Sequence, residues 1–248
     1  MVLKEYINNI KNDTSFLKNK AWINSKELVK HFEEKKIPSN ASEEWKNFRT
    51  NELSEVSWKI PELNEETNVD QAVKKVKNSI VLINGVFESD ISTFKNQEGI
   101  NVIRTETYLK QNPSFIKNLY NNPKKYAENR LSGLYDDKPT SLLSLNTLLN
   151  KGIVVELEAN KKIVETINIV NVSCSNKVDL LINPYIILIC NEGSEANFHE
   201  VYFNKNCWTN AFLEAYIEPN ATLFFTRVQK SMQKSIKTAS FNCHVKKN

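Results

Sequence analysis

The side chains that could hold a metal ion are few and poorly spaced for that role. The chain has three histidines, and none lies in an H-x-H or H-E-x-x-H pattern, the spacings that bring two ligands to one ion. His199 and Glu200 are neighbours in an expected strand, so their side chains point to opposite faces. Cys243 and His244 diverge for the same reason and could supply at most one ligand to a shared site. We therefore predict no metal ligand in this chain, and ordinary hydrogen-bonded or exposed roles for all three histidines, including His31.

The four cysteines also lack a pattern that indicates metal or redox chemistry. They are widely separated and contain no C-x-x-C spacing. Cys190 ends an apolar segment and is explained by packing, whereas Cys207 is expected in a loop beside Trp208. We expect these two, together with Cys174 and Cys243, to be reduced thiols.

Signatures of catalysis are missing as well. With five glycines the chain has neither a G-x-S-x-G nucleophile turn nor a glycine-rich phosphate loop. A polysaccharide-cleaving enzyme would need carboxylates gathered on one face, but the candidates are scattered over expected strands and turns: Glu195, Glu200, Glu214 and Glu218. We predict no catalytic residue and no enzymatic activity. A stand-alone β-helix or cupin-like enzyme remains the alternative, and it requires two further ligands or carboxylates close to His199.

Charge is nearly balanced except at the end of the sequence. The 33 Lys and Arg residues exceed the 29 Asp and Glu residues by four, too little for a dedicated nucleic-acid binder, so we expect no nucleic-acid partner. No acidic residue follows Glu218, whereas six basic ones do: Arg227, Lys230, Lys234, Lys237, Lys246 and Lys247. A solvated face, or a patch whose acidic complement lies on another chain, accounts for them. A basic binding module is the alternative, and it predicts association that depends steeply on salt.

From the sequence we expect neither a secretory signal nor a membrane span. Residues 1–20 interleave charges and Asn with apolar residues, unlike a secretory signal, and no stretch approaches the roughly 18 apolar residues of a membrane span. We expect a cytoplasmic protein without a membrane partner.

The elements expected along the chain change character twice. Residues 1–40 show helical periodicity, with Leu3, Tyr6, Ile7 and Ile10 on one face, and predict a helical hairpin. Residues 41–139 are mixed. They include a strand, turn and strand over 79–87 with Asn84-Gly85 at the turn, and short helical stretches over 108–131 that Pro113 and Pro123 interrupt. A leucine-rich helix is expected over 140–149, and Gly152 is expected to take a positive φ where the chain turns away from it.

A series of strands is predicted after Gly152. β-Branched and aromatic residues predict strands over 153–157, 163–172, 185–190, 196–203, 211–218 and 222–229. The segments after two turns are alike, Ser194 to Phe198 (SEANF) and Pro219 to Leu223 (PNATL), which favours either a β-sandwich or a parallel β-helix with stacked coils. Residues 227–237 alone would suit an amphipathic helix, with Arg227, Lys230, Lys234 and Lys237 on one face, but we expect the strand series to continue through them.

Several motifs follow one another in an order that resembles a known family. They are residues 42–53 (SEEWKNFRTNEL) with Trp45 as anchor, 81–87 (VLINGVF), 145–153 (LNTLLNKGI), 184–202 (PYIILICNEGSEANFHEVY), 208–211 (WTNA) and 218–223 (EPNATL). In this order they resemble the SufD proteins, scaffold subunits of iron–sulfur cluster assembly, over about residues 42–229. The sequence departs from that family at Asn47-Phe48, where Tyr-Thr is usual, and at 230–237, where a histidine is common. The related SufB proteins share the fold, but the region of Trp45 is more similar to SufD.

The resemblance implies a fold and a role. It implies an α+β chain in which an N-terminal helical region precedes a right-handed parallel β-helix, with residues 1–40 as the helical hairpin, 41–139 as a mixed α/β region and 140–248 as an incomplete set of β-helix coils. It implies a non-catalytic subunit that acts with SufB-like and SufC-like proteins. The iron–sulfur cluster, and the ATP on SufC, then belong to the complex, and no cofactor is bound by this chain alone.

The resemblance also implies what the chain lacks. In the family the interface residues, including a histidine implicated in metal binding, lie in later coils, and SufC docks on a terminal helical domain. No position here matches those motifs, so no catalytic, cofactor-binding or metal residue is transferred to this sequence. A β-helix cut between coils exposes unpaired backbone groups, and we therefore expect self-association through that open end.

Overall fold

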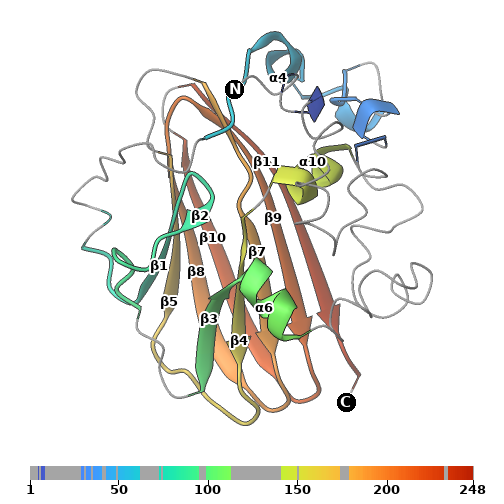
Figure 1. Ribbon diagram of the computed structural model, residues 1–248. Helices are drawn as coiled ribbons and strands as arrows, with labels where there is room; N and C mark the ends of the chain where they lie inside the picture. Colours follow the sequence, from blue (N-terminus) through green and yellow to red (C-terminus); the bar gives the residue numbers. More distant parts are fainter. Residues whose placement is uncertain are drawn as a thin grey trace.

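Two β-sheets that face each other form the centre of the molecule (Figure 1). The structure, a computed structural model, describes residues 5, 7–8, 29–30, 32–34, 36–40, 43–48, 50–61, 73, 75–94, 99–112, 141–149, 151–173, 179–231 and 234–247. The described part is mostly β, with few helices, which is consistent with the expected α+β class.

The first sheet, here called the β8 sheet, has the strand order β10-β8-β5-β1-β2. Its strands are β1 (Ser79–Ile83), β2 (Val86–Phe87), β5 (Ile167–Val172), β8 (Glu195–Asn204) and β10 (Thr222–Ser231). The second, the β9 sheet, has the order β11-β9-β7-β4-β3, and β6 also pairs with β9. Its strands are β3 (Ile100–Arg104), β4 (Ile153–Leu157), β6 (Leu180–Ile182), β7 (Tyr185–Cys190), β9 (Cys207–Ile217) and β11 (Ser235–Val245).

From β4 onward the chain passes back and forth between the two sheets, with the consecutive strands β6 and β7 both pairing with β9. β4, β7, β9 and β11 lie in one sheet and β5, β8 and β10 in the other, and neighbours within each of these series pair in parallel. Glu195 pairs with Thr222, 27 positions later, and Cys207 pairs with Ser235, 28 positions later. Earlier in the chain the offset is longer, 31 positions from Ile167 to Phe198 and 33 from Ile153 to Ile186. Each circuit of the chain therefore stacks on the one before it, with turns of different length between the strands. At the other edge of the sheets, β2 pairs antiparallel with β1 and β3 pairs antiparallel with β4.

Apolar side chains from both sheets fill the space between them. In β8 burial alternates residue by residue, as expected of a strand with one face toward a core. Members of this core are Ile80, Leu82, Ile153, Val155, Ile169, Ile186, Leu188, Phe198 and Leu213. β1 and β3 both come before position 140 in the sequence. β1 pairs with β5 in one sheet and β3 pairs with β4 in the other, so both sheets include residues from this earlier part of the chain.

Helices cover the outer side of the β9 sheet. α10 (Ser141–Leu149) lies there, as does α6 (Thr105–Gln111) beside β3 and β4 (Figure 1). Asn146 of α10 donates hydrogen bonds to the carbonyl oxygens of Pro184 and Asn210, and Asn210 Nδ2 donates to the carbonyl oxygen of Leu142. The short helices η1 (Glu43–Trp45) and α4 (Asn51–Glu55) belong to an apolar cluster with α10, in which the rings of Trp58 and Trp208 lie 5.7 Å apart. The side-chain to backbone hydrogen bonds of Asn146 and Asn210 fix α10 on the β9 sheet.

Most elements expected from the sequence are present, with three corrections. The helix over 141–149, the turn at Asn84-Gly85 with positive φ at both residues, and the strands through residue 245 confirm the expectations. The strand expected from 163 begins at Ile167. Cys207 begins β9 and is buried, so the expected loop position is wrong. The helical hairpin and the stretches around Pro113 and Pro123 lie largely outside the described residues.

Gly152 is the third correction. Its φ is not positive, contrary to the expectation. Among the described glycines only Gly85, Gly99 and Gly193 have a positive φ. Its role is close packing instead. A Cβ at this position would lie 2.4 Å from the carbonyl oxygen of Tyr185, which no side chain can approach without backbone movement.

Candidate functional site

A group of polar side chains replaces the apolar core near the last circuit of strands. On β8, Ala196 and Phe198 point into the core, and the same alternation directs Glu200 and Tyr202 inward as well. Glu200 is buried, with only 1 % of its surface exposed. We call the group of Asn171, Glu200, Tyr202, Arg227 and Lys237 the Glu200 cluster; its members come from β5, β8, β10 and β11.

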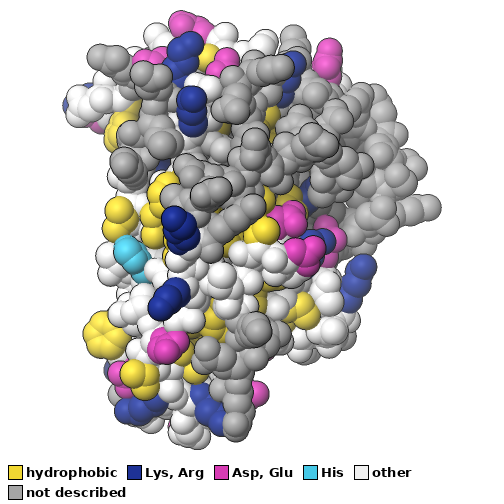
Figure 2. Space-filling view, turned by 90° about the vertical axis from the view of Figure 1, so that its left-hand side faces the viewer, with side chains coloured by type: hydrophobic (Ala, Val, Ile, Leu, Met, Phe, Trp, Pro, Cys, Tyr) yellow, Lys and Arg dark blue, Asp and Glu magenta, His cyan; other side chains and the backbone are white. Residues whose placement is uncertain are grey.

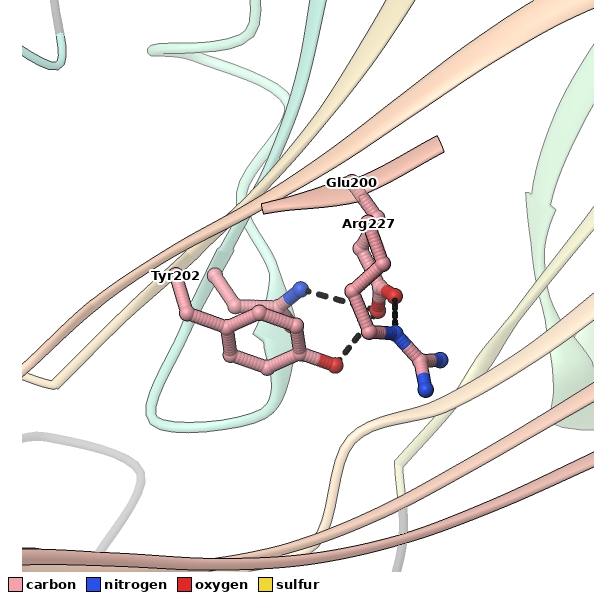
Figure 3. A network of polar contacts seen from close by, with 4 residues as sticks. Glu200, Tyr202 and Arg227 are labelled. Carbon is pink, nitrogen blue, oxygen red and sulfur yellow. Dashed lines mark hydrogen bonds and ion pairs between the residues drawn. The ribbon is translucent and has the colours of Figure 1, made fainter. Parts of the chain in front are cut away.

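Hydrogen bonds converge on the Glu200 carboxylate from three directions (Figure 3). Asn171 Nδ2 and the Tyr202 hydroxyl donate to Oε1, at 3.3 Å and 2.5 Å. Arg227 Nε donates to Oε2 at 2.5 Å and forms an ion pair with it. The terminal nitrogens of Arg227 extend away from Glu200 in this view. The carboxylate is thus held in place by one charged and two neutral donors, as a buried charge requires.

Lys237 completes the cluster from the opposite sheet. Its Nζ lies 3.1 Å from the centroid of the Tyr202 ring. Burial lowers the pKa of Lys237 to about 7, because the charged form loses hydration; Glu200 opposes this shift and Arg227 adds to it. Burial also raises the pKa of Tyr202 well above its usual value, with a further contribution from Glu200. Neither Lys237 Nζ nor Arg227 Nη2 has a hydrogen-bond partner among the residues that the structure describes.

This placement corrects the interpretation of the basic segment as a solvated face. Arg227 and Lys237 lie in strands and face the space between the sheets, whereas Lys234 is exposed at the turn between those strands. In the structure Leu223 and Phe225 alternate with exposed residues along β10, and the same period puts Arg227 on their side. The sequence hid this alternation, because the exposed positions include the apolar Phe224 and Val228. Helical periodicity over 227–237 concealed it.

A second buried carboxylate, Glu214, lies on the other side of the β9 sheet. Tyr185 and Tyr216 donate hydrogen bonds to its Oε2 at 3.1 Å and 2.9 Å, and the Tyr216 ring stacks on His244 with centroids 5.1 Å apart. Burial raises the pKa of Glu214 to about 8, although both tyrosine hydrogen bonds act in the opposite direction. Its Oε1 has no hydrogen-bond partner in the described ranges. At neutral pH this side chain is therefore largely protonated.

The remaining sequence candidates are not brought together. His199 is half-buried and pairs in register with Thr226 on the side of β8 opposite to Glu200, as expected of neighbours in a strand. Within the described ranges no three His, Cys, Asp or Glu side chains are placed to hold a metal ion. Cys190, Cys207 and Cys243 are free thiols, and His31 and Cys174 lie outside the described residues.

Strands β10 and β11 form a distinct surface at the end of both sheets, here called the terminal rim. No described strand pairs with their outer edges. Four of the six large apolar side chains that are exposed in the described part belong to them: Phe224, Val228, Phe241 and Val245. Neither strand contains an acidic residue. Unpaired edges with exposed apolar side chains are ready to accept further strands.

The face in Figure 2 mixes apolar, basic and acidic side chains among its described residues, without a broad field of one charge. None of the described helices is long and apolar enough to cross a membrane. A scan against protein-family models gives no match, and no curated protein matches the chain significantly.

Proposed function

We propose that this chain is a SufD-like, non-catalytic scaffold subunit of iron–sulfur cluster assembly, built as a right-handed parallel β-helix. One observation carries the proposal: strands that pass between two sheets and stack in parallel at offsets of 27 to 33 residues. A stacked parallel ladder of this kind is the architecture that the ordered sequence motifs imply. The Trp45 motif and the leucine-rich helix precede the ladder in the same order.

In this role the chain binds partner proteins and does not itself catalyse a reaction. ATP hydrolysis belongs to a SufC-like partner, and the assembling cluster is cargo that the complex handles together with a SufB-like partner. The β-helix supplies a rigid body with long edges, because every circuit is held by ladders in two sheets. The terminal rim offers backbone donors and acceptors, together with apolar side chains, to a partner strand.

Co-purification tests the scaffold role. We expect SufB-like and SufC-like proteins of the same organism, one of them tagged, to retain this chain, expressed with any coding sequence that follows it. A Phe241→Lys, Val245→Lys variant should weaken retention because it places charge on the terminal rim. Val164→Lys is the matched control, since Val164 is 93 % exposed and lies outside the rim. If the unaltered chain is not retained, the scaffold proposal is wrong.

The terminal rim also predicts self-association of the 248-residue chain. At high concentration two copies should pair through these edges, and sedimentation velocity should show dimers or larger species. Association should strengthen with added salt, because the rim carries basic and no acidic residues and like charges repel. The Phe241→Lys, Val245→Lys variant should shift the chain toward monomer and Val164→Lys should not. A chain that stays monomeric at high concentration and high salt would contradict this prediction.

A further inference from the structure

The Glu200 cluster continues into an apolar patch at the terminal rim. Phe225 of β10 and Phe241 of β11 contact each other across the two sheets, with ring centroids 5.3 Å apart. The guanidinium carbon of Arg227 lies 5.7 Å from the centroid of the Phe225 ring. Two aromatic rings and two cationic side chains, Arg227 and Lys237, thus belong to the same pair of strands.

The charges of this region do not balance. Glu200 supplies one negative charge, and Arg227 and protonated Lys237 supply two positive ones. Nη2 of Arg227 and Nζ of Lys237 are both shielded from solvent and lack a hydrogen-bond partner among the described residues. Buried donors without partners cost free energy, and a buried unpaired cation costs more. One further monovalent anion would satisfy both donors and neutralise the cluster.

We propose that β10 and β11 form a binding site for an organic monocarboxylate. Its carboxylate accepts hydrogen bonds from Arg227 Nη2 and Lys237 Nζ, and its apolar body packs on Phe225 and Phe241. A monoanion fits better than phosphate, because a dianion would leave the buried cluster with excess negative charge. This site does not depend on the proposed scaffold role.

The apolar body of the ligand would lie on the exposed part of β11, at Ala239 and Phe241. Lys237, Ala239 and Phe241 share one side of the strand, and the residue between the cation and the ring is a small, exposed alanine. Lys237 has a long side chain that no described hydrogen bond holds, so its Nζ can move from the Tyr202 ring to the carboxylate. The bound anion would stabilise the ammonium form, which burial disfavours in its absence.

Binding of sodium benzoate to the full chain, measured by titration calorimetry and by ligand-observed NMR at slightly acidic pH and constant ionic strength, tests the site. We expect saturable binding of one benzoate per chain. Lys237→Met should weaken it at least about tenfold, because a charge-assisted hydrogen bond is lost. Lys237→Arg should retain most of the affinity, and the matched control Lys234→Met, at an exposed turn position, should leave it unchanged.

Binding measurements with a peptide and with inorganic phosphate identify the source and the chemical class of the ligand. Benzoate binding that depends on Lys237 supports a free carboxylate. A peptide of alternating Glu and Val that binds with the same dependence, when benzoate does not, supports a carboxylate carried on a polypeptide strand. Inorganic phosphate binding more tightly than either, an equal loss in Lys234→Met, or no binding by any carboxylate would overturn the proposal. Lys237→Met should fold, because Lys237 makes no described hydrogen bond; its circular dichroism spectrum checks this directly.

Discussion

Arg227→Met should lower the free energy of unfolding by about 3 kcal/mol, because it leaves the Glu200 carboxylate buried without its main charged partner. The Glu200 side chain is 1 % exposed, so water cannot replace the lost donor. Tyr202 and Asn171 still donate to Oε1, which keeps the loss toward the lower end of the range for broken buried ion pairs. Urea denaturation followed by circular dichroism measures the change.

A double-mutant cycle separates the ion pair from general packing. Glu200→Gln with Arg227→Met removes both charges and should recover most of the stability that Arg227→Met alone loses. Lys246→Met is the matched control, because its ion pair with Glu218 joins side chains that are 50 % and 17 % exposed and should contribute less than about 1 kcal/mol. Equal losses in Arg227→Met and Lys246→Met would show that Glu200 does not depend on its arginine.

The pH dependence of stability should change sharply in Glu214→Gln. The pKa of Glu214 is about 8 in the folded chain and near 4.5 when unfolded, so the folded state binds more protons between these values. Its contribution to stability is therefore complete below about pH 4.5 and declines until about pH 8. From about pH 5.5 to pH 8.5 the unaltered chain should lose roughly 3 kcal/mol more than Glu214→Gln, whose amide stays neutral.

Denaturation curves at both pH values measure that difference. The matched control, Glu195→Gln, removes one carboxylate from a side chain that is 42 % exposed and should leave the slope nearly unchanged. Tyr185→Phe with Tyr216→Phe removes both donors to Glu214, and should lower stability most at high pH, where the carboxylate is charged. Parallel pH profiles for the unaltered chain and Glu214→Gln would contradict the assigned protonation.

The strands could be predicted because they are rich in β-branched and aromatic residues, although only some, such as β8, alternate in burial, whereas β7 and most of β9 are buried on both faces. The turn at Asn84-Gly85 could also be predicted, since few residues accept positive φ in succession. The first residue of β5 could not be predicted, because Ile163 packs on the core before the strand begins and extends the apolar pattern. Gly152 was misread because close approach to the Tyr185 carbonyl is a tertiary contact that no local pattern encodes.

The buried polar residues were the largest failure of sequence reasoning. From the sequence, Glu200 was considered as a neighbour of His199 and as one of several scattered carboxylates, and Lys237 as one of a series of basic residues. The charged partner of Glu200 is 27 positions away, since Arg227 reaches it from the next strand of the ladder. The one-circuit offset becomes visible only when the sheets are known. An alignment of the strands at that offset would have placed Arg227 beside Glu200.

The stacking of successive circuits limits how the length of such a chain can change over generations. Because each circuit contacts chiefly the circuits before and after it, an insertion or deletion of one whole circuit lengthens or shortens the stack and leaves the other contacts intact. An insertion or deletion of one residue within a strand would instead turn core side chains outward. Tolerated length variation in this part of the gene should thus occur in whole circuits or in the turns between strands.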